Sequence, residues 1–169
     1  MAIHRLDVND LQSWCSMSFN STKANPMAFA KDIYINGSND FALVLPEDVC
    51  AIGNNAFYNC KGLRSLTIKG KVKQIGMNCF ADCINLKNVS LSDDIENIGN
   101  GGFANCKSLT SVHLPANLSF ISDSLFYGCE NLTDVTIPQS VKEIRKGAFS
   151  VLMRICPSLM YFLLILSLL

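Results

Sequence analysis

The sequence has no excess of either charge. Its 169 residues include 14 basic and 14 acidic side chains, so the formal net charge is zero. No block of five like charges occurs in it. Proteins that bind nucleic acid or an anionic membrane surface concentrate lysine and arginine, because phosphate groups must be neutralised. We therefore expect no nucleic-acid partner.

Residues suited to catalysis are also scarce. The chain has only two histidines, His4 and His113, and it contains no G-x-S-x-G, H-E-x-x-H or phosphate-binding glycine loop. His113 has hydroxyl-bearing neighbours in the sequence, but no identifiable carboxylate would orient it for general-base work. The sequence predicts that the protein is not an enzyme and needs no cofactor.

The cysteines lack the spacing of a metal site. Eight are present, yet no C-x-x-C or H-x-x-x-H pair occurs, and zinc needs ligands that converge on one point. Four of them recur at a fixed interval, at Cys60, Cys83, Cys106 and Cys129. Because free cysteine is among the most buried residue types, we expect this column to lie in the core and expect no metal.

The chain does contain a strict internal repeat. Phenylalanine recurs every 23 residues without an insertion, at Phe57, Phe80, Phe103, Phe126 and Phe149. The first four are each followed by a cysteine and then a leucine, at Leu63, Leu86, Leu109 and Leu132. A period of about 20 to 50 residues predicts one supersecondary unit per period, which buries its apolar face against its neighbours.

Each period is predicted to hold one short strand. In the third period, Leu109, Val112 and Leu114 form an L-x-x-V-x-L pattern whose alternate side chains point inward. Pro115 then ends the strand, because proline donates no ladder hydrogen bond. Stacked edge to edge, the strands form one parallel sheet, and the equivalents of this strand are expected at 63–68, 86–91 and 132–137.

A second apolar pair closes each coil after its strand. In three of the five coils the isoleucine of this pair is followed by glycine, at Gly53, Gly76 and Gly99. This pattern predicts a turn through a conformation that side chains with a Cβ resist. Ser122 and Arg145 take the place of glycine in the other two coils.

These residues resemble those of a known family. The pattern F-x-x-C-x-x-L-x-x-V-x-[IL]-P followed by V-x-x-I-G, running from Leu43 to Phe149, is similar to the BspA-like, Treponema-type leucine-rich repeats. The resemblance implies a short right-handed repeat solenoid, mostly β-strand and turn, with one parallel β-sheet. It also implies a cell-surface or extracellular protein of the kind that gut and oral bacteria and some parasitic protists use for adhesion.

The flanking segments follow the repeat less closely. Residues 1–28 are poorly patterned, although Asp10 could cap a short helix containing Leu11, Trp14 and Cys15. Residues 29–46 are predicted to form a capping hairpin, in which Asn36-Gly37 begins the loop between strands at 33–36 and 41–45. The array itself is placed at 47–149, and 150–169 is a divergent apolar tail.

The two ends leave the cellular location open. Residues 1–11 show no uninterrupted apolar stretch, so no signal peptide is visible; either the protein stays inside the cell or Met1 is not the original start. The apolar run 159–169 is shorter than the ~20 residues that span a bilayer. Three interpretations are open, in decreasing order of preference: a truncated or frame-shifted end, a degenerate last coil, and an anchor that contacts the membrane.

The outward positions of the strands form the candidate binding site. They would lie on the concave sheet face, where small polar side chains suit either weak binding of a protein or glycan ligand or simple solvation. The sequence thus favours a non-catalytic protein-binding or adhesion module of a cell-surface recognition protein. The alternatives are an intracellular protein-interaction scaffold and a truncated gene fragment without independent function. The face comprises Arg64, Ser65, Thr67, Lys87, Asn88, Ser90, Thr110, Ser111, His113, Thr133, Asp134 and Thr136.

Overall fold

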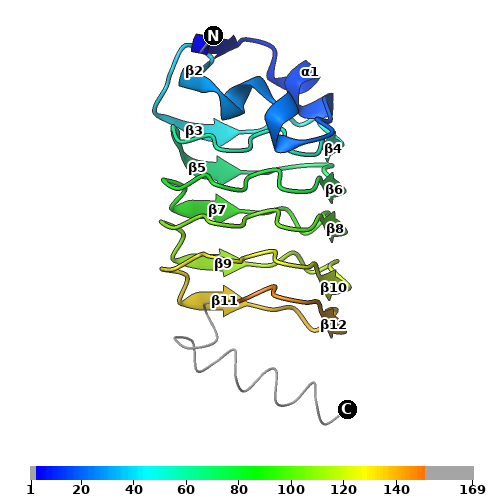
Figure 1. The fold of residues 1–169 in the computed structure, drawn as a ribbon. Helices are drawn as coiled ribbons and strands as arrows, with labels where there is room; N and C mark the ends of the chain where they lie inside the picture. Colours follow the sequence, from blue (N-terminus) through cyan, green and yellow to red (C-terminus); the bar gives the residue numbers. More distant parts are fainter. Residues whose placement is uncertain (1–2, 151–169) are drawn as a thin grey trace.

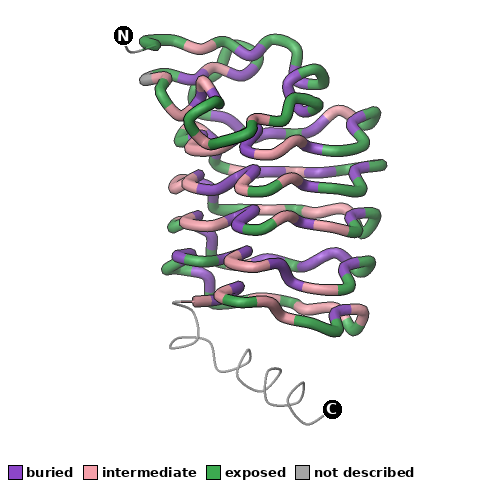
Figure 2. Tube along the Cα trace, turned by 45° about the vertical axis from the view of Figure 1, so that its right-hand side comes forward, coloured by how far each residue is buried: buried purple, intermediate pink, exposed green. Residues whose placement is uncertain are grey.

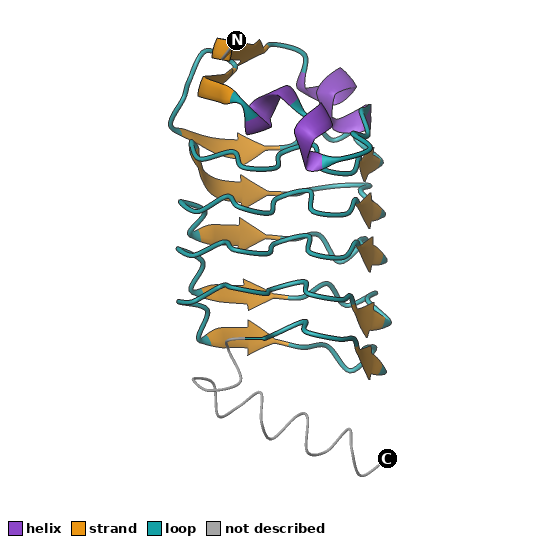
Figure 3. Ribbon diagram, in the orientation of Figure 1, coloured by secondary structure: helices purple, strands orange, loops and turns teal. Residues whose placement is uncertain are grey.

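The chain winds into a stack of similar coils, as the computed structural model, which describes residues 3–150, shows (Figure 1). Each coil carries one strand on one side of the stack and a two-residue strand on another side (Figure 3). All the pairings between coils are parallel. The predicted repeat solenoid is therefore confirmed, and the structure adds a second set of strands to the predicted sheet.

The strands of the first ladder are β3 (Phe41–Val44), β5 (Leu63–Thr67), β7 (Asn88–Ser90), β9 (Ser111–His113) and β11 (Asp134–Thr136). Those of the second ladder are β4 (Ala51–Ile52), β6 (Gln74–Ile75), β8 (Asn97–Ile98), β10 (Phe120–Ile121) and β12 (Glu143–Ile144). Three of the four strands predicted at six residues are only three residues long, because the register pairs cover only the middle of each segment.

Stacked phenylalanine rings fill the core. Successive ring centroids lie 5.3, 5.4, 5.9 and 5.6 Å apart and the planes are within 17° of parallel. The cysteine column lies beside them: the thiols of Cys83, Cys106 and Cys129 each donate to the carbonyl of a phenylalanine in the preceding coil, at 3.1 to 3.2 Å. Figure 2 shows buried positions along every coil. The interval of 23 residues is thus the length of one coil.

The glycines after the isoleucines have a different role from the predicted one. Positive φ angles occur two residues later, at Asn55, Asn78 and their equivalents, and not at the glycines themselves. A Cβ at Gly76 would instead lie 2.5 Å from backbone atoms of the preceding coil, and one at Gly99 would lie 2.6 Å from the nitrogen of Met77. Glycine is needed there because the coils approach closely.

The N-terminal segment forms a cap on the first coil. It comprises β1 (Ile3–Val8), α1 (Leu11–Ser16), the 3-10 turns η1 (Thr22–Ala24) and η2 (Pro26–Ala28), and β2 (Ala30–Ile35). The predicted short helix is confirmed, and a carboxylate oxygen of Asp10 accepts a hydrogen bond from the Ser13 backbone N–H at 3.0 Å. The buried Trp14 donates from Nε1 to the carbonyl of Ala56, 2.9 Å away, which fastens the cap to the coil below.

The predicted hairpin is wrong in its pairing. The tight turn does form, since Ile35 and Ser38 exchange backbone hydrogen bonds around Asn36 and Gly37, whose φ angles are 48° and 82°. However, β2 pairs in parallel with β1, and β3 pairs in parallel with β5. Because Phe41 and Leu43 occupy buried positions like those of the repeat strands, β3 joins the stack instead of folding back on β2.

The two ladders are interrupted at the same level. Within residues 3–150, no strand pairing joins β7 to β9 or β8 to β10. The turns at this level remain bonded, for example from the N–H of Phe80 to the carbonyl of Gly102 at 2.9 Å. Val89 and Leu91 of the upper coil are half-buried, whereas Leu66 and Ile68 one coil earlier are 1% and 2% exposed. We call this level the seam.

The predicted apolar tail, from 151 onward, lies outside the described residues, so the three interpretations of it stay predictions. Among residues 3–150, no helix has both the length and the apolar character that crossing a bilayer requires.

Candidate binding surface

The first ladder brings the predicted site residues into columns. Its register places Ser65 beside Asn88 and Thr67 beside Ser90 on β5 and β7. On β9 and β11 it places Ser111 beside Asp134 and His113 beside Thr136. These eight side chains are exposed or half-buried. They form a face whose backbone groups are largely used between strands, so side chains alone would contact a partner.

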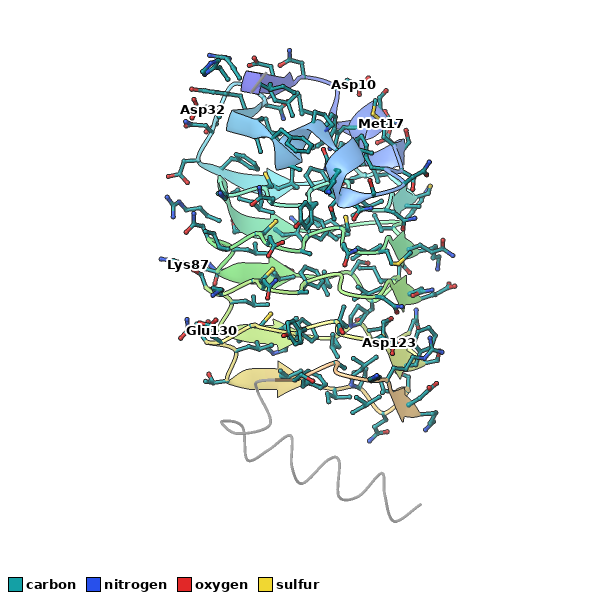
Figure 4. All side chains as sticks on the ribbon, in the orientation of Figure 1. Asp10, Met17, Asp32, Lys87, Asp123 and Glu130 are labelled. Carbon is teal, nitrogen blue, oxygen red and sulfur yellow. The ribbon has the colours of Figure 1, made fainter. Side chains whose placement is uncertain are left out.

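A third column lies just before the strands. The N–H of Lys87 donates to the carbonyl of Arg64 at 2.8 Å, and that of Thr133 donates to the carbonyl of Thr110 at 3.0 Å. All four side chains are exposed. We call the twelve predicted residues the ladder face, of which Figure 4 labels Lys87.

The seam divides this face into two groups. Six of the residues belong to the coils of β5 and β7, and the other six to the coils of β9 and β11, and no strand hydrogen bonds join the two groups. The predicted face is therefore two adjoining patches on one stack, each held together by its own pairing.

Sequence reasoning missed the first strand of the same face. Ala42 lies beside Ser65 and Val44 lies beside Thr67 in the register of β3 and β5. Val44 is 56% exposed, which makes it the largest apolar side chain at the outward positions of this ladder. The alternation of the segment F-A-L-V was the available signal, since its buried Phe41 and Leu43 leave the residues between them outward.

Charge on the ladder face is sparse. Arg64 forms an ion pair with Asp40, and this hydrogen bond raises the pKa of the guanidinium. Both side chains are more than half exposed, so the pair adds little to stability. Lys87 and Asp134 have no ion-pair partner among residues 3–150. They are the charges available to a partner.

Other chemistry has no assembled site in the part of the chain that is described. His4 lies on β1 in the cap and His113 on β9, four coils away along the stack (Figure 1). No group of three or more metal-ligating side chains gathers within residues 3–150. Burial raises the pKa of Cys60 to about 12 and that of Cys83 well above its usual value. Such thiols are poor nucleophiles and poor ligands.

Comparison with known proteins finds clear similarity. The family model for the BspA type leucine-rich repeat region matches residues 22–155 in six copies, beyond both ends of the pattern at 43–149. Among curated proteins, none matches the chain significantly.

Solved structures share the fold. A leucine-rich repeat protein of T. pallidum is 34% identical over 66% of this chain and 55% of its own, with a TM-score of 0.62. A leucine-rich cell surface protein of Faecalibacterium prausnitzii is 25% identical over 88% of this chain and 39% of its own, with a TM-score of 0.63. A Bacteroides ovatus leucine-rich repeat protein has a TM-score of 0.57 at 23% identity, over 88% of this chain and 36% of its own. This chain therefore spans about a third to a half of the length of these neighbours.

Proposed function

The chain belongs to the BspA-type leucine-rich repeat family, and on that basis we propose that it is a non-catalytic module that binds a protein through the ladder face. We further propose that it works at the cell surface, as part of a recognition or adhesion protein. The F. prausnitzii neighbour is described as a cell surface protein, which supports this location. Recognition by a repeat stack needs no catalytic group, only a rigid surface of adequate size.

One observation carries the proposal. Three columns of outward side chains run along a ladder whose strands are fixed by parallel pairing on both sides of the seam. Because these side chains are held in place before a partner arrives, binding would cost little ordering of the protein. The unpaired Lys87 and Asp134 would then set the orientation of the partner.

The size of the face sets an upper limit on affinity. Five strands at ~4.8 Å spacing and four residues at ~3.3 Å give about 250 Å². A stable interface uses about 800 Å² per partner. This chain alone should bind weakly, and tight adhesion would need contacts beyond the ladder face or several arrays acting together.

A photo-crosslinking side chain tests the binding face directly. It would replace Ser90 on the ladder face and, as a matched control, Glu143 on the second ladder, in cells that carry the gene. Both positions are exposed. We expect protein adducts from position 90 and few from position 143. Equal adducts from both positions, or adducts from neither, would contradict the proposal.

Surface proteolysis of intact cells tests the location separately. A protein at the surface is cleaved before lysis. Protection until lysis would favour the alternative of an intracellular scaffold that uses the same face.

A further inference from the structure

A groove of about 580 Å³ lies where the cap meets the second ladder, away from the ladder face. Helix α1 forms one end of it, and the strands β4, β6 and β8 with the turns that follow them form its length. Met17, at the end of α1, marks this corner of the molecule in Figure 4. The volume falls within the range of about 300 to 1,000 Å³ found for small-ligand sites.

The floor of the groove consists of glycine. Gly53, Gly76 and Gly99 stack in successive coils and line it. They have no side chain because a Cβ at any of them would collide with backbone within 3.0 Å. The next residue in this column is Ser122, which carries a side chain and does not line the groove. The same close approach that tightens the stack therefore leaves an open channel across three coils.

The walls are lined by uncharged polar groups. Carboxamides come from Gln12 on α1, from Gln74 and Asn97 on adjacent strands, and from Asn54. Hydroxyls come from serines of the cap, and Met77, which is 46% exposed, adds an apolar surface. The only charged side chain in the lining is Asp48, and the lining contains no lysine or arginine.

Three of the carboxamides are available to a ligand. The side chains of Gln12, Gln74 and Asn97 make no hydrogen bond to any residue within 3–150, whereas the oxygen of Asn54 already accepts from the N–H of Met77 at 2.8 Å. Each free carboxamide offers two N–H donors and one acceptor oxygen. Gln74 and Asn97 are register partners, so they repeat at the ~4.8 Å spacing of the ladder.

We propose that this groove binds a neutral oligosaccharide. A sugar hydroxyl donates and accepts, as a carboxamide does, and a ligand with several hydroxyls along its length matches amides repeated along the coils. The lack of a cation disfavours phosphate, sulfate and carboxylate ligands, which proteins hold with arginine or lysine. An added peptide strand is disfavoured too, because β6 is already paired on both sides and offers no free edge.

Titration with defined sugars tests the site. Maltotetraose, cellotetraose and chitotetraose would be added to the ¹⁵N-labelled full chain, with tetragalacturonate as the acidic comparison. At least one neutral tetrasaccharide should shift the side-chain amide resonances of Gln12, Gln74 and Asn97. The double substitution Gln74→Ala and Asn97→Ala should weaken its binding at least about tenfold, equivalent to about 1.4 kcal/mol.

A matched pair of substitutions controls for the fold. Thr67→Ala and Ser90→Ala remove two register partners on the ladder face, and they should leave sugar binding unchanged; urea unfolding checks that both double variants fold. The proposal is overturned if none of the three neutral sugars binds at about 10 mM. It is equally overturned if tetragalacturonate binds as well as they do, or if the Gln74→Ala and Asn97→Ala variant binds normally.

Discussion

The buried thiols predict that this protein unfolds in mild alkali. Burial raises the pKa of Cys15 and Cys60 to about 12 and holds those of Cys79, Cys83 and Cys106 well above the usual thiol value of 9.0. The folded state therefore keeps five protons that the unfolded chain releases. Since the folded pKa values are the higher ones, the stability is fully present below pH 9 and is lost as the pH rises toward 12.

The size of the effect follows from the unfolded pKa. At pH 10, one unit above the ordinary thiol pKa of 9.0, each thiol that stays protonated in the fold lowers the free energy of unfolding by about 1.4 kcal/mol. Five such thiols lower it by about 7 kcal/mol, which is comparable to the entire stability of a typical domain, about 5 to 15 kcal/mol. Lysines, with pKa values of about 10.4, are still mostly charged in this window.

Urea unfolding followed by circular dichroism at pH 7, 9, 9.5 and 10, in the presence of a reductant, measures this loss. The double variant Cys60→Ala and Cys83→Ala should lose only about 4 kcal/mol over the same range, since three of the five thiols remain. Cys50 is exposed, so Cys50→Ala is the matched control and should lose as much as the parent. A change below about 1 kcal/mol between pH 7 and 10, or the same loss in the double variant, would refute the reasoning.

Three further predictions concern the stack itself. Phe103→Ala removes a ring that packs between two others, at 5.4 and 5.9 Å, and should cost about 3 to 5 kcal/mol in urea unfolding; an unchanged unfolding curve would mean that the coils are registered differently. Ser122→Ala removes the hydroxyl that donates to the Ile98 carbonyl and should cost about 1 to 3 kcal/mol, whereas Ser122→Gly should cost less, because glycine allows the backbone N–H to make this bond as at Gly76 and Gly99. Hydrogen exchange should be faster at the amides of Leu91 and Thr110, which face the seam without a partner among residues 3–150, than at Leu114 and Thr133, which are bonded; equal protection would argue against an open seam.

The core of this fold could be predicted from sequence because the same residue recurs at the same position of every coil. Phe57 and Phe80 pack face to face because each lies one full coil from the other, and Cys83 donates to the carbonyl of Phe57 for the same reason. Such contacts need only the period. The outward positions followed equally well, since alternation along a strand places Thr67 and Ser90 on the same side.

The cap could not be predicted in the same way, because its pairing depends on competition between segments. The residues around Asn36 and Gly37 favour a turn, and the turn forms. The strand after it is nevertheless paired with the next coil, and β1, which shows no pattern of its own, takes its place beside β2. A local turn signal therefore identified the bend but not the partner of either strand.

The seam marks a second limit, since the period predicts which residues lie above one another but not how closely the coils approach. At Gly76 and Gly99 the missing Cβ allows the N–H to reach a carbonyl of the preceding coil at 2.8 Å. Ser122 carries a Cβ, and its hydroxyl, not its N–H, bonds to Ile98. Arg145 also carries one, but its N–H pairs at 2.9 Å and its guanidinium lies over the ring of Phe120. The closeness of two coils thus depends on side chains 23 residues apart acting together, which no single repeat contains.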